Sequence, residues 1–121
     1  MPKILVADDS RFQVELLSNW LSEKGATVVV AGDALQAWMK ALRTEPDAII
    51  LDINMPGGTG LEVLKRLRLS AKTQHIPVIV VSSNQESEQS ARSLGAAEFL
   101  PKPLDSELLA QALTRLLGQQ F

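Results

Sequence analysis

The chain contains no cysteine, which excludes disulfide bonds, thiolate metal sites and thiol chemistry. It also lacks an excess of positive charge. The net charge at pH 7 is −2, so nothing indicates direct binding to nucleic acid. Long apolar runs are absent, and the N-terminus enters a strand pattern without the apolar region of a signal peptide. We therefore expect a protein that neither spans a membrane nor is secreted. A cytoplasmic location agrees with the lack of cysteine.

What is present is an ordinary globular composition, with 45% hydrophobic and 21% charged residues in a chain of 121. This length suits one hydrophobic core, and no linker, internal repeat or low-complexity segment divides the chain. The sequence therefore predicts a single domain over residues 1–121.

The stretch from Ala48 to Gly60 (AIILDINMPGGTG) sets the pattern for the rest of the chain. Its first four residues are an unbroken apolar run, typical of a strand buried on both faces of a parallel sheet. The run stops at Asp52. We expect the following Met-Pro-Gly-Gly segment to be neither helix nor strand, and Thr59 with Glu62 three residues later predicts a helix start. Asp52 thus stands at the carboxyl end of a buried strand, where open α/β sheets bind ligands.

Five strand patterns alternate with five helix patterns along the chain. Apolar strands alternating with amphipathic helices predict an α/β fold with a parallel sheet covered on both sides. The predicted strands are 3–7, 27–31, 48–51, 77–82 and 97–100. The predicted helices run from Ser10 to a stop at Gly25, from a cap at Asp33 to a stop at Pro46, from Gly60 to about Ser70, from Gln85 to Leu94 and from Asp105 to Leu117.

Apolar spacing predicts which side of each helix meets the sheet. On the second helix the expected core residues are Leu35, Trp38, Met39 and Leu42, and on the last helix Leu108, Leu109, Leu113, Leu116 and Leu117. On the third helix we expect Lys65, Arg66 and Arg68 to be solvated. The fourth helix carries almost no apolar residue, so we expect it to be loosely packed.

Polar residues follow the predicted strands. In a parallel sheet every strand points the same way, so residues just past the strands share one edge. If the first and third strands are neighbours, three carboxylates converge there, flanked by a hydroxyl and an ammonium. The residues at this edge are Asp8 and Asp9 after the first strand, Asp52 after the third, Ser82 and Ser83 after the fourth, and Lys102 past the fifth.

Three carboxylates in one place repel one another unless a cation lies among them. Two unit charges about 5 Å apart interact by roughly 3 kcal/mol at an effective dielectric constant near 20. With only oxygen ligands at hand, the expected ion is hard, and Mg²⁺ fits better than Ca²⁺ because it needs fewer protein oxygens. Lys102 and Ser82 could then meet phosphate oxygens. Together these groups could move a phosphoryl group onto a carboxylate.

Each of these residues also has a structural alternative. Asp8 and Asp9 could be N-cap acids of the first helix, Ser82 could cap the fourth helix, and Lys102 could be an ordinary surface lysine. Convergence of complementary groups from four strand ends favours a site. Pro101 and Pro103, which flank Lys102, restrict the backbone that orients it.

Other classes of protein share this architecture. A flavodoxin-type FMN binder would need a phosphate loop after the first strand, where Asp8 and Asp9 would repel phosphate. A haloacid-type hydrolase would place D-x-D there, whereas this chain has adjacent acids. Trp20 and Trp38 are expected to pack in helices, and His75 to be exposed.

Asp8-Asp9, Asp52 followed by Ile-Asn-Met-Pro-Gly, Ser82 and Lys102-Pro103 occur in this order at the strand ends. In this combination, residues 3 to about 117 resemble the receiver domain of two-component response regulators. The resemblance implies a flavodoxin-like, CheY-like fold: one doubly wound, five-stranded parallel sheet with five helices and strand order 2-1-3-4-5. It also implies a bacterial signalling domain that assists its own aspartyl phosphorylation and dephosphorylation and has no separate substrate.

The resemblance further implies that Asp52 accepts a phosphoryl group from a histidine of a sensor kinase or a phosphotransfer protein. It implies that Asp9 and Asp52 ligate Mg²⁺ directly, with the backbone carbonyl of Asn54 as another ligand and Asp8 acting largely through water. A receiver-like module that docks or dimerises without phosphorylation is the alternative from another functional class.

The implied switch involves three residues. Lys102 would pair with the phosphoryl group, Ser82 would move to hydrogen-bond it, and Phe99 stands where the family keeps an aromatic residue that turns inward on activation. Phe offers no hydroxyl to a partner, so packing alone would carry this change. The surface of the fourth helix, fifth strand and last helix would then control a downstream partner or output domain. The cognate kinase, homodimerisation and the isomer of the Lys102-Pro103 bond stay open.

Overall fold

Strand β3 (Ala48–Asp52) is the middle strand of a five-stranded sheet in the computed structural model, which describes residues 1–121. All five of its residues are buried, as expected for a strand covered on both faces. The strand order is β2-β1-β3-β6-β7 and every neighbouring pair is parallel. This arrangement confirms the predicted α/β class and the strand order implied by the receiver resemblance.

The elements follow the predicted alternation. The other strands of the sheet are β1 (Lys3–Ala7), β2 (Thr27–Ala31), β6 (Val78–Ser82) and β7 (Glu98–Pro101). The helices are α1 (Arg11–Glu23), α2 (Ala34–Thr44), α3 (Gly60–Leu69), α4 (Glu88–Ser93) and α5 (Ser106–Leu117). None of these helices combines the length and the apolar character needed to cross a bilayer.

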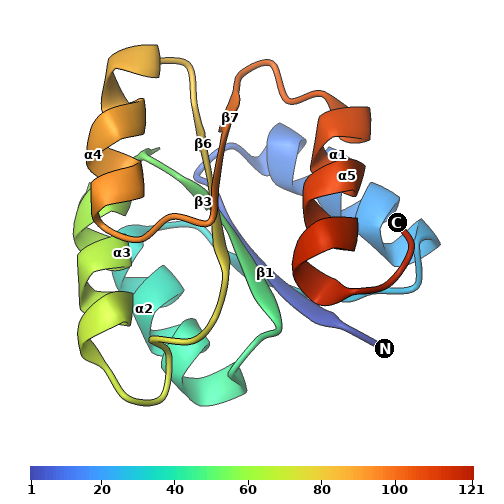
Figure 1. The fold of residues 1–121 in the computed structure, drawn as a ribbon, viewed down its shortest axis with the longest axis horizontal. Helices are drawn as coiled ribbons and strands as arrows, with labels where there is room; N and C mark the ends of the chain where they lie inside the picture. The colour runs from blue at the N-terminus through green and yellow to red at the C-terminus, as the bar shows by residue number, and fades with distance from the viewer.

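Helices cover the sheet on both faces, with α1 and α5 on one side and α2, α3 and α4 on the other (Figure 1). Successive strand residues point to opposite faces, so each strand supplies both layers. Ile50 packs in the cluster with α1 and α5, whereas Ile49 and Leu51 pack in the cluster with α2, α3 and α4. The two cores explain why the strands are apolar without alternation.

The prediction that the Met-Pro-Gly-Gly segment avoids strand structure was wrong. β4 (Asn54–Met55) and β5 (Gly58–Thr59) pair antiparallel in a small hairpin. Pro56 and Gly57 form its turn, and Gly57 has φ +81°, the conformation expected of glycine at the third position of a type II turn. The backbone N–H of Ala34 donates to the Pro56 carbonyl (3.1 Å), which fixes the hairpin to the start of α2.

The predicted core face of α2 was wrong for Leu35 and Met39, whereas Trp38 does pack against the core. The buried residues are Ala34, Ala37 and Ala41, while Leu35 and Met39 are 60% and 41% exposed. Small side chains at this spacing let the helix lie close to the sheet. Trp38 and Leu42, on the flank, are partly buried.

Three further helical expectations need correction. Arg68 is partly buried and donates to the carbonyls of Gln74 and Ile76, whereas Lys65 and Arg66 are exposed as predicted. On α5, Leu108 is 42% exposed, because Leu109, Ala112 and Leu113 form the buried face. The predicted fourth helix is divided into a 3₁₀ turn (Gln85–Ser87) and the six-residue α4, of which only Ala91 is buried.

Candidate functional site

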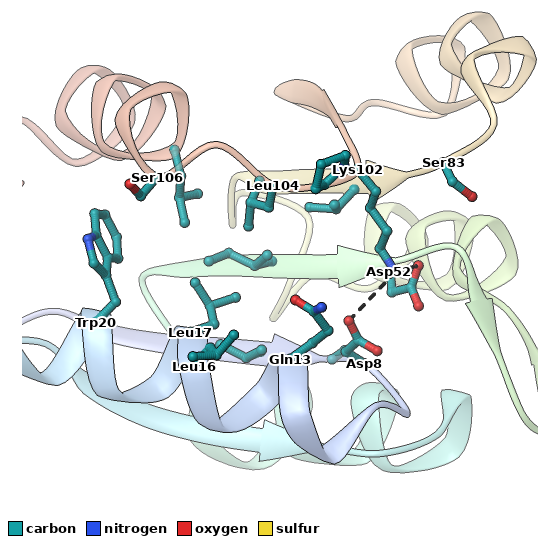
Figure 2. A pocket seen from close by; sticks show the side chains of 16 residues that line it. Asp8, Gln13, Leu16, Leu17, Trp20, Asp52, Ser83, Lys102, Leu104 and Ser106 are labelled. Carbon is teal, nitrogen blue, oxygen red and sulfur yellow. Dashed lines mark ion pairs between the residues drawn. The ribbon is translucent and has the colours of Figure 1, made fainter.

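The carboxyl ends of the strands bring together the residues singled out in the sequence. Asp52 is the last residue of β3, and Ser82 is the last residue of β6. Asp8 and Asp9 follow β1, and Lys102 follows β7. Because β3 pairs with both β1 and β6, Asp52 lies between the other groups (Figure 2).

The three carboxylates converge as expected. Asp8, Asp9 and Asp52 each offer an oxygen, and these atoms lie within 4.8 Å of one another. Asp52 is 4% exposed, whereas Asp9 is exposed to solvent. The backbone N–H of Ser10 donates to Oδ1 of Asp8 (2.9 Å), which orients that carboxylate. A buried acid, a partly buried acid and an exposed acid therefore share one small volume.

Lys102 supplies the positive charge of the cluster. Its Nζ lies 3.1 Å from Oδ1 of Asp52 and 3.8 Å from Oδ2 of Asp8. The backbone N–H of Lys102 donates to the Ser82 carbonyl (3.0 Å), so the residue is anchored to β6, and the peptide bond to Pro103 is cis. One ammonium thus bridges two of the three acids.

Burial raises the pKa of the Asp52 carboxyl above its ordinary value of 3.8. The charge of Asp8 acts in the same direction, while the hydrogen bond and charge of Lys102 lower the pKa of Asp52. The backbone N–H of Asn54 also donates to Asp52 (3.4 Å), a weaker lowering influence. Overall the pKa of Asp52 is raised, which means that its surroundings destabilise the charged carboxylate. A further cation would therefore be favoured here.

The structural alternatives for these residues are not realised. The N-cap of α1 is Ser10, whose Oγ accepts from the N–H of Gln13. The turn before α4 is capped by the side chain of Asn84, which accepts from the N–H of Glu86. Lys102 is an ion-pair partner, as described above. Neither Asp8 nor Ser82 is therefore needed as a helix cap.

Ser82 is 1% exposed and its hydroxyl bonds locally. Its Oγ accepts from the N–H of Asn84 (3.0 Å) and donates to the Asn84 carbonyl (3.4 Å). Ser83 is exposed and lines the pocket of Figure 2. Asn54 is exposed at the start of the β4–β5 hairpin. The Ser82 hydroxyl is thus next to the site but turned to the loop after β6.

Phe99, the proposed switch aromatic, is 6% exposed and belongs to the cluster beneath α2, α3 and α4. It pairs in register with Val80 of β6, two residues before Ser82. Its ring is already buried in this structure. His75 is exposed, and Trp38 packs against the same cluster as Phe99, as expected for both.

Gly60 is a site residue whose role the sequence reasoning missed. A Cβ on Gly60 would overlap the carbonyl oxygen of Asp52 and lie 2.8 Å from Cα of Ile53. The N–H of Gly60 donates to the Ile53 carbonyl (2.7 Å), so α3 starts directly against the end of β3. The sequence held one signal for this role, a glycine at the start of the helix that Thr59 caps. Glycine is a poor helix former, so its presence there indicates a role other than helix formation.

The donor set fits a hard divalent cation. It consists only of carboxylate oxygen atoms, from Asp8 and Asp9 after β1 and from Asp52 at the end of β3. Their mutual repulsion is offset by one lysine alone. The geometry therefore supports a magnesium site at this edge of the sheet.

Comparison with known proteins points the same way. The family model for the response regulator receiver domain matches residues 4–114. Protein PilH of Pseudomonas aeruginosa is 33% identical over 120 residues, which cover 98% of this chain and 99% of PilH. The response regulator PleD of Caulobacter vibrioides is 36% identical over 118 residues, but this chain spans only 26% of PleD.

Solved structures agree in fold. The chemotaxis response regulator CheY4 of Vibrio cholerae has a TM-score of 0.89 and 33% identity, with 96% of this chain and 98% of that chain covered. The receiver domain of the sensor histidine kinase PA1611 from Pseudomonas aeruginosa has a TM-score of 0.89 and 25% identity, with 98% of both chains covered, and holds a magnesium ion in its active site cleft. The present chain belongs to the response regulator receiver domain family of two-component signalling.

Proposed function

We propose that this chain is a signalling switch in which Asp52 accepts a phosphoryl group. Receiver domains act in phosphorylation-dependent signalling. The observation that supports Asp52 as acceptor is its position: it is the most buried of three converging acids, it pairs with Lys102 at 3.1 Å, and it lines an open pocket. Asp8 and Asp9 lie at the edge of that arrangement, nearer to solvent.

Mg²⁺ is the proposed cofactor. Asp9 and Asp52 would ligate it directly, the Asn54 backbone carbonyl would add a ligand, and Asp8 would act largely through water. The ion would supply positive charge for the oxygens of the transferring group. The oxygen-only donor set supports this proposal, and so does the magnesium ion held in the cleft of the PA1611 receiver domain.

Transfer of the phosphoryl group needs little from the protein beyond positioning the reacting groups and stabilising their charge. A carboxylate oxygen of Asp52 forms a bond to phosphorus, the bond between phosphorus and the donor imidazole nitrogen breaks, and that nitrogen keeps the electron pair. Lys102 pairs with the phosphoryl oxygens, and the hydroxyl of Ser82 leaves Asn84 to hydrogen-bond them. Lys102 also lowers the pKa of Asp52, in opposition to burial, which favours the nucleophilic form.

Ser82 and Phe99 are the proposed switch residues. Phosphorylation adds close to two negative charges, which draw the Ser82 hydroxyl away from the loop that leads to α4. Because Phe99 is already buried, the first change we propose is in this loop and in α4, where only Ala91 is buried. The surface of α4, β7 and α5 then differs between the two states and controls a partner protein or output domain.

The proposed phosphodonor is a histidine of a sensor kinase or of a phosphotransfer protein, and the proposed location of the chain is the cytoplasm. The chain spans nearly all of PilH and about a quarter of PleD. A downstream target protein and an output domain are therefore both compatible with the proposal.

Incubation with acetyl phosphate tests the proposal directly. With Mg²⁺, we expect the intact mass to increase by one acid-labile phosphoryl group, with no increase in a chelator or in Asp52→Asn. A wild-type chain that gains no phosphate under these conditions would favour a docking module that works without phosphorylation.

A further inference from the structure

Helix α2 carries a second apolar surface besides the one that packs on the sheet. Its inner side is formed by the small residues Ala34, Ala37 and Ala41. On its other side Leu35 and Met39, one helical turn apart, are 60% and 41% exposed, and we call these two residues the outer face of α2. No other element of the chain covers this outer face, and the proposed phosphoryl transfer does not use it.

The polar side chains of α2 do not shield the outer face. Oε1 of Gln36 accepts from the backbone N–H of Gly32, and Nζ of Lys40 donates to the carbonyl of Val30. Both side chains are therefore turned toward β2, the edge strand of the sheet. Arg43, one turn beyond the outer face, is exposed and continues the row. The outward side of α2 thus presents two large apolar side chains followed by a cation.

The start of α2 is acidic. Asp33 is the N-cap of the helix. The carboxylate of Glu62 lies beside the same end, since Glu62 and Ala34 both adjoin Gly58. Glu62 belongs to α3, which lies next to α2 in the same layer of helices (Figure 1). Two carboxylates therefore precede the outer face.

From the middle of α2 onward the charge is positive. The guanidinium of Arg66, also on α3, lies 5.8 Å from the centroid of the Trp38 ring. Arg43 lies in the last turn of α2. The exposed acid Glu45 follows the helix and only partly offsets these two cations. The outer face is therefore flanked by opposite charges at its two ends.

We propose that the outer face of α2 binds the same face of a second copy of this chain, with the two helices antiparallel. Leu35 of one copy then packs near Met39 of the other, and the acidic start of each α2 meets the arginines of the opposite copy, twice by symmetry. A parallel arrangement would place like charges together. A few side chains per copy bury far less than the roughly 1,600 Å² of a standard interface, so this dimer is weak and readily reversible.

Disulfide crosslinking is a specific test, because the chain has no cysteine and an introduced thiol is the only one present. Met39 lies at the middle of α2, close to the symmetry axis of the proposed dimer. On mild oxidation with diamide, Met39→Cys should form a disulfide-linked dimer. Leu108→Cys, on α5 across the sheet, is the matched control, since Leu108 is 42% exposed. Met39→Cys should crosslink roughly tenfold faster or more, because the proposed dimer raises the effective thiol concentration.

Sedimentation velocity tests the same contact without oxidation. The sedimentation coefficient of the wild type should rise from micromolar to millimolar concentration. Met39→Asp and Met39→Lys, each alone, should sediment as monomers, because like charges then meet at the axis. An equimolar mixture of these two variants should associate more strongly than either one alone, since opposite charges then face each other.

Equal crosslinking rates at residues 39 and 108 would overturn the proposal. So would a wild type that stays monomeric at millimolar concentration, or a mixture of the charged variants that sediments like each variant alone. Neither measurement involves phosphoryl transfer. A chain that dimerises through α2 but gains no phosphate from acetyl phosphate refutes the proposed function alone, and a phosphorylated chain that shows no such contact refutes the α2 dimer alone.

Discussion

Lys102 pairs with Asp52 across the strand ends, with Nζ 3.1 Å from Oδ1. Asp52 is 4% exposed, so this pair is screened by solvent far less than a surface ion pair. Lys102 directly follows β7 and Asp52 ends β3, and β6 lies between these two strands. The contact therefore depends on β3, β6 and β7 lying side by side in the sheet order β2-β1-β3-β6-β7.

Replacing Lys102 by methionine should raise the pKa of Asp52 further, because the lysine is the main influence that lowers it. A charge-assisted hydrogen bond contributes about 1.5–3 kcal/mol, so phosphorylation by acetyl phosphate at neutral pH should slow by roughly tenfold or more. The rate of phosphate incorporation measures this. Lys65→Met, on the exposed side of α3, is the matched control and should keep the wild-type rate.

Removing a carboxylate charge should stabilise the metal-free protein. The pKa of Asp52 is raised, so the folded chain binds its proton more tightly than the unfolded chain does. This group therefore lowers stability as pH rises from 3.8 through its folded pKa. Asp52→Asn, and less strongly Asp8→Asn, should raise the melting temperature at pH 7 in a chelator by several degrees, about 4 °C per kcal/mol.

The gain from Asp52→Asn should shrink as the pH falls through the folded pKa of Asp52 and should vanish below pH 3.8, where the carboxyl becomes protonated in both states. Added Mg²⁺ should stabilise the wild type and not Asp52→Asn. Melting temperatures of Asp52→Asn at or below those of the wild type at pH 7 would show that the acids do not repel one another as described.

Gly60→Ala should destabilise the fold by about 1–3 kcal/mol, because the new Cβ would overlap backbone atoms of Asp52 and Ile53. Chemical denaturation measures this loss. Gly32→Ala is the control, since Gly32 directly follows β2 and a Cβ there meets nothing within 4 Å. Equal stability of the two variants would mean that α3 can move away from β3 at no cost.

A second ion-pair cluster joins α4, β7 and α5. Glu98 accepts from Arg92 (2.9 Å) and from Arg115 (2.6 Å), and Arg92 also pairs with Glu88 (2.9 Å). Burial raises the pKa of Glu98, but the two arginines and the N–H of Phe99 outweigh it and the pKa is lowered from 4.5. The stability from this group is therefore present above pH 4.5 and lost as pH falls through the folded pKa.

Glu98→Gln should cost roughly 1 kcal/mol of unfolding free energy at pH 7, because the arginines are about half exposed and solvent screens them. The difference from wild type should disappear at low pH and narrow in high salt. Denaturation at several pH values tests this. A deficit that stays constant down to pH 3 would assign the effect to packing.

Local patterns in the sequence were enough to predict the five strands of the main sheet and the positions of the helices. β-branched and aliphatic runs ended at residues such as Asp52, and caps such as Thr59 and Asp105 mark the helix starts that the structure shows. The site residues were found because parallel strands share an edge. The strand order itself came from the family resemblance, since local patterns do not say which strands pair.

The wrong and missed predictions share a physical cause, because each depends on how closely helices and strands approach one another in space. On α2 the large residues Leu35 and Met39 suggested the buried face, but alanines lie there because the helix approaches the sheet closely. Gly60 was seen only as a helix start, since its importance depends on the backbone of Asp52, which passes close by in space. The pocket beside the site likewise exists only once α1 and α5 are placed side by side.

The most direct test of the account is chemical mapping of the phosphorylated residue. After treatment with acetyl phosphate and Mg²⁺, borohydride reduces an aspartyl phosphate to homoserine, and peptide mass spectrometry identifies its position. We expect homoserine at residue 52 alone. Homoserine at Asp8 or Asp9, or at no position, would contradict the proposal that the buried acid paired with Lys102 accepts the phosphoryl group.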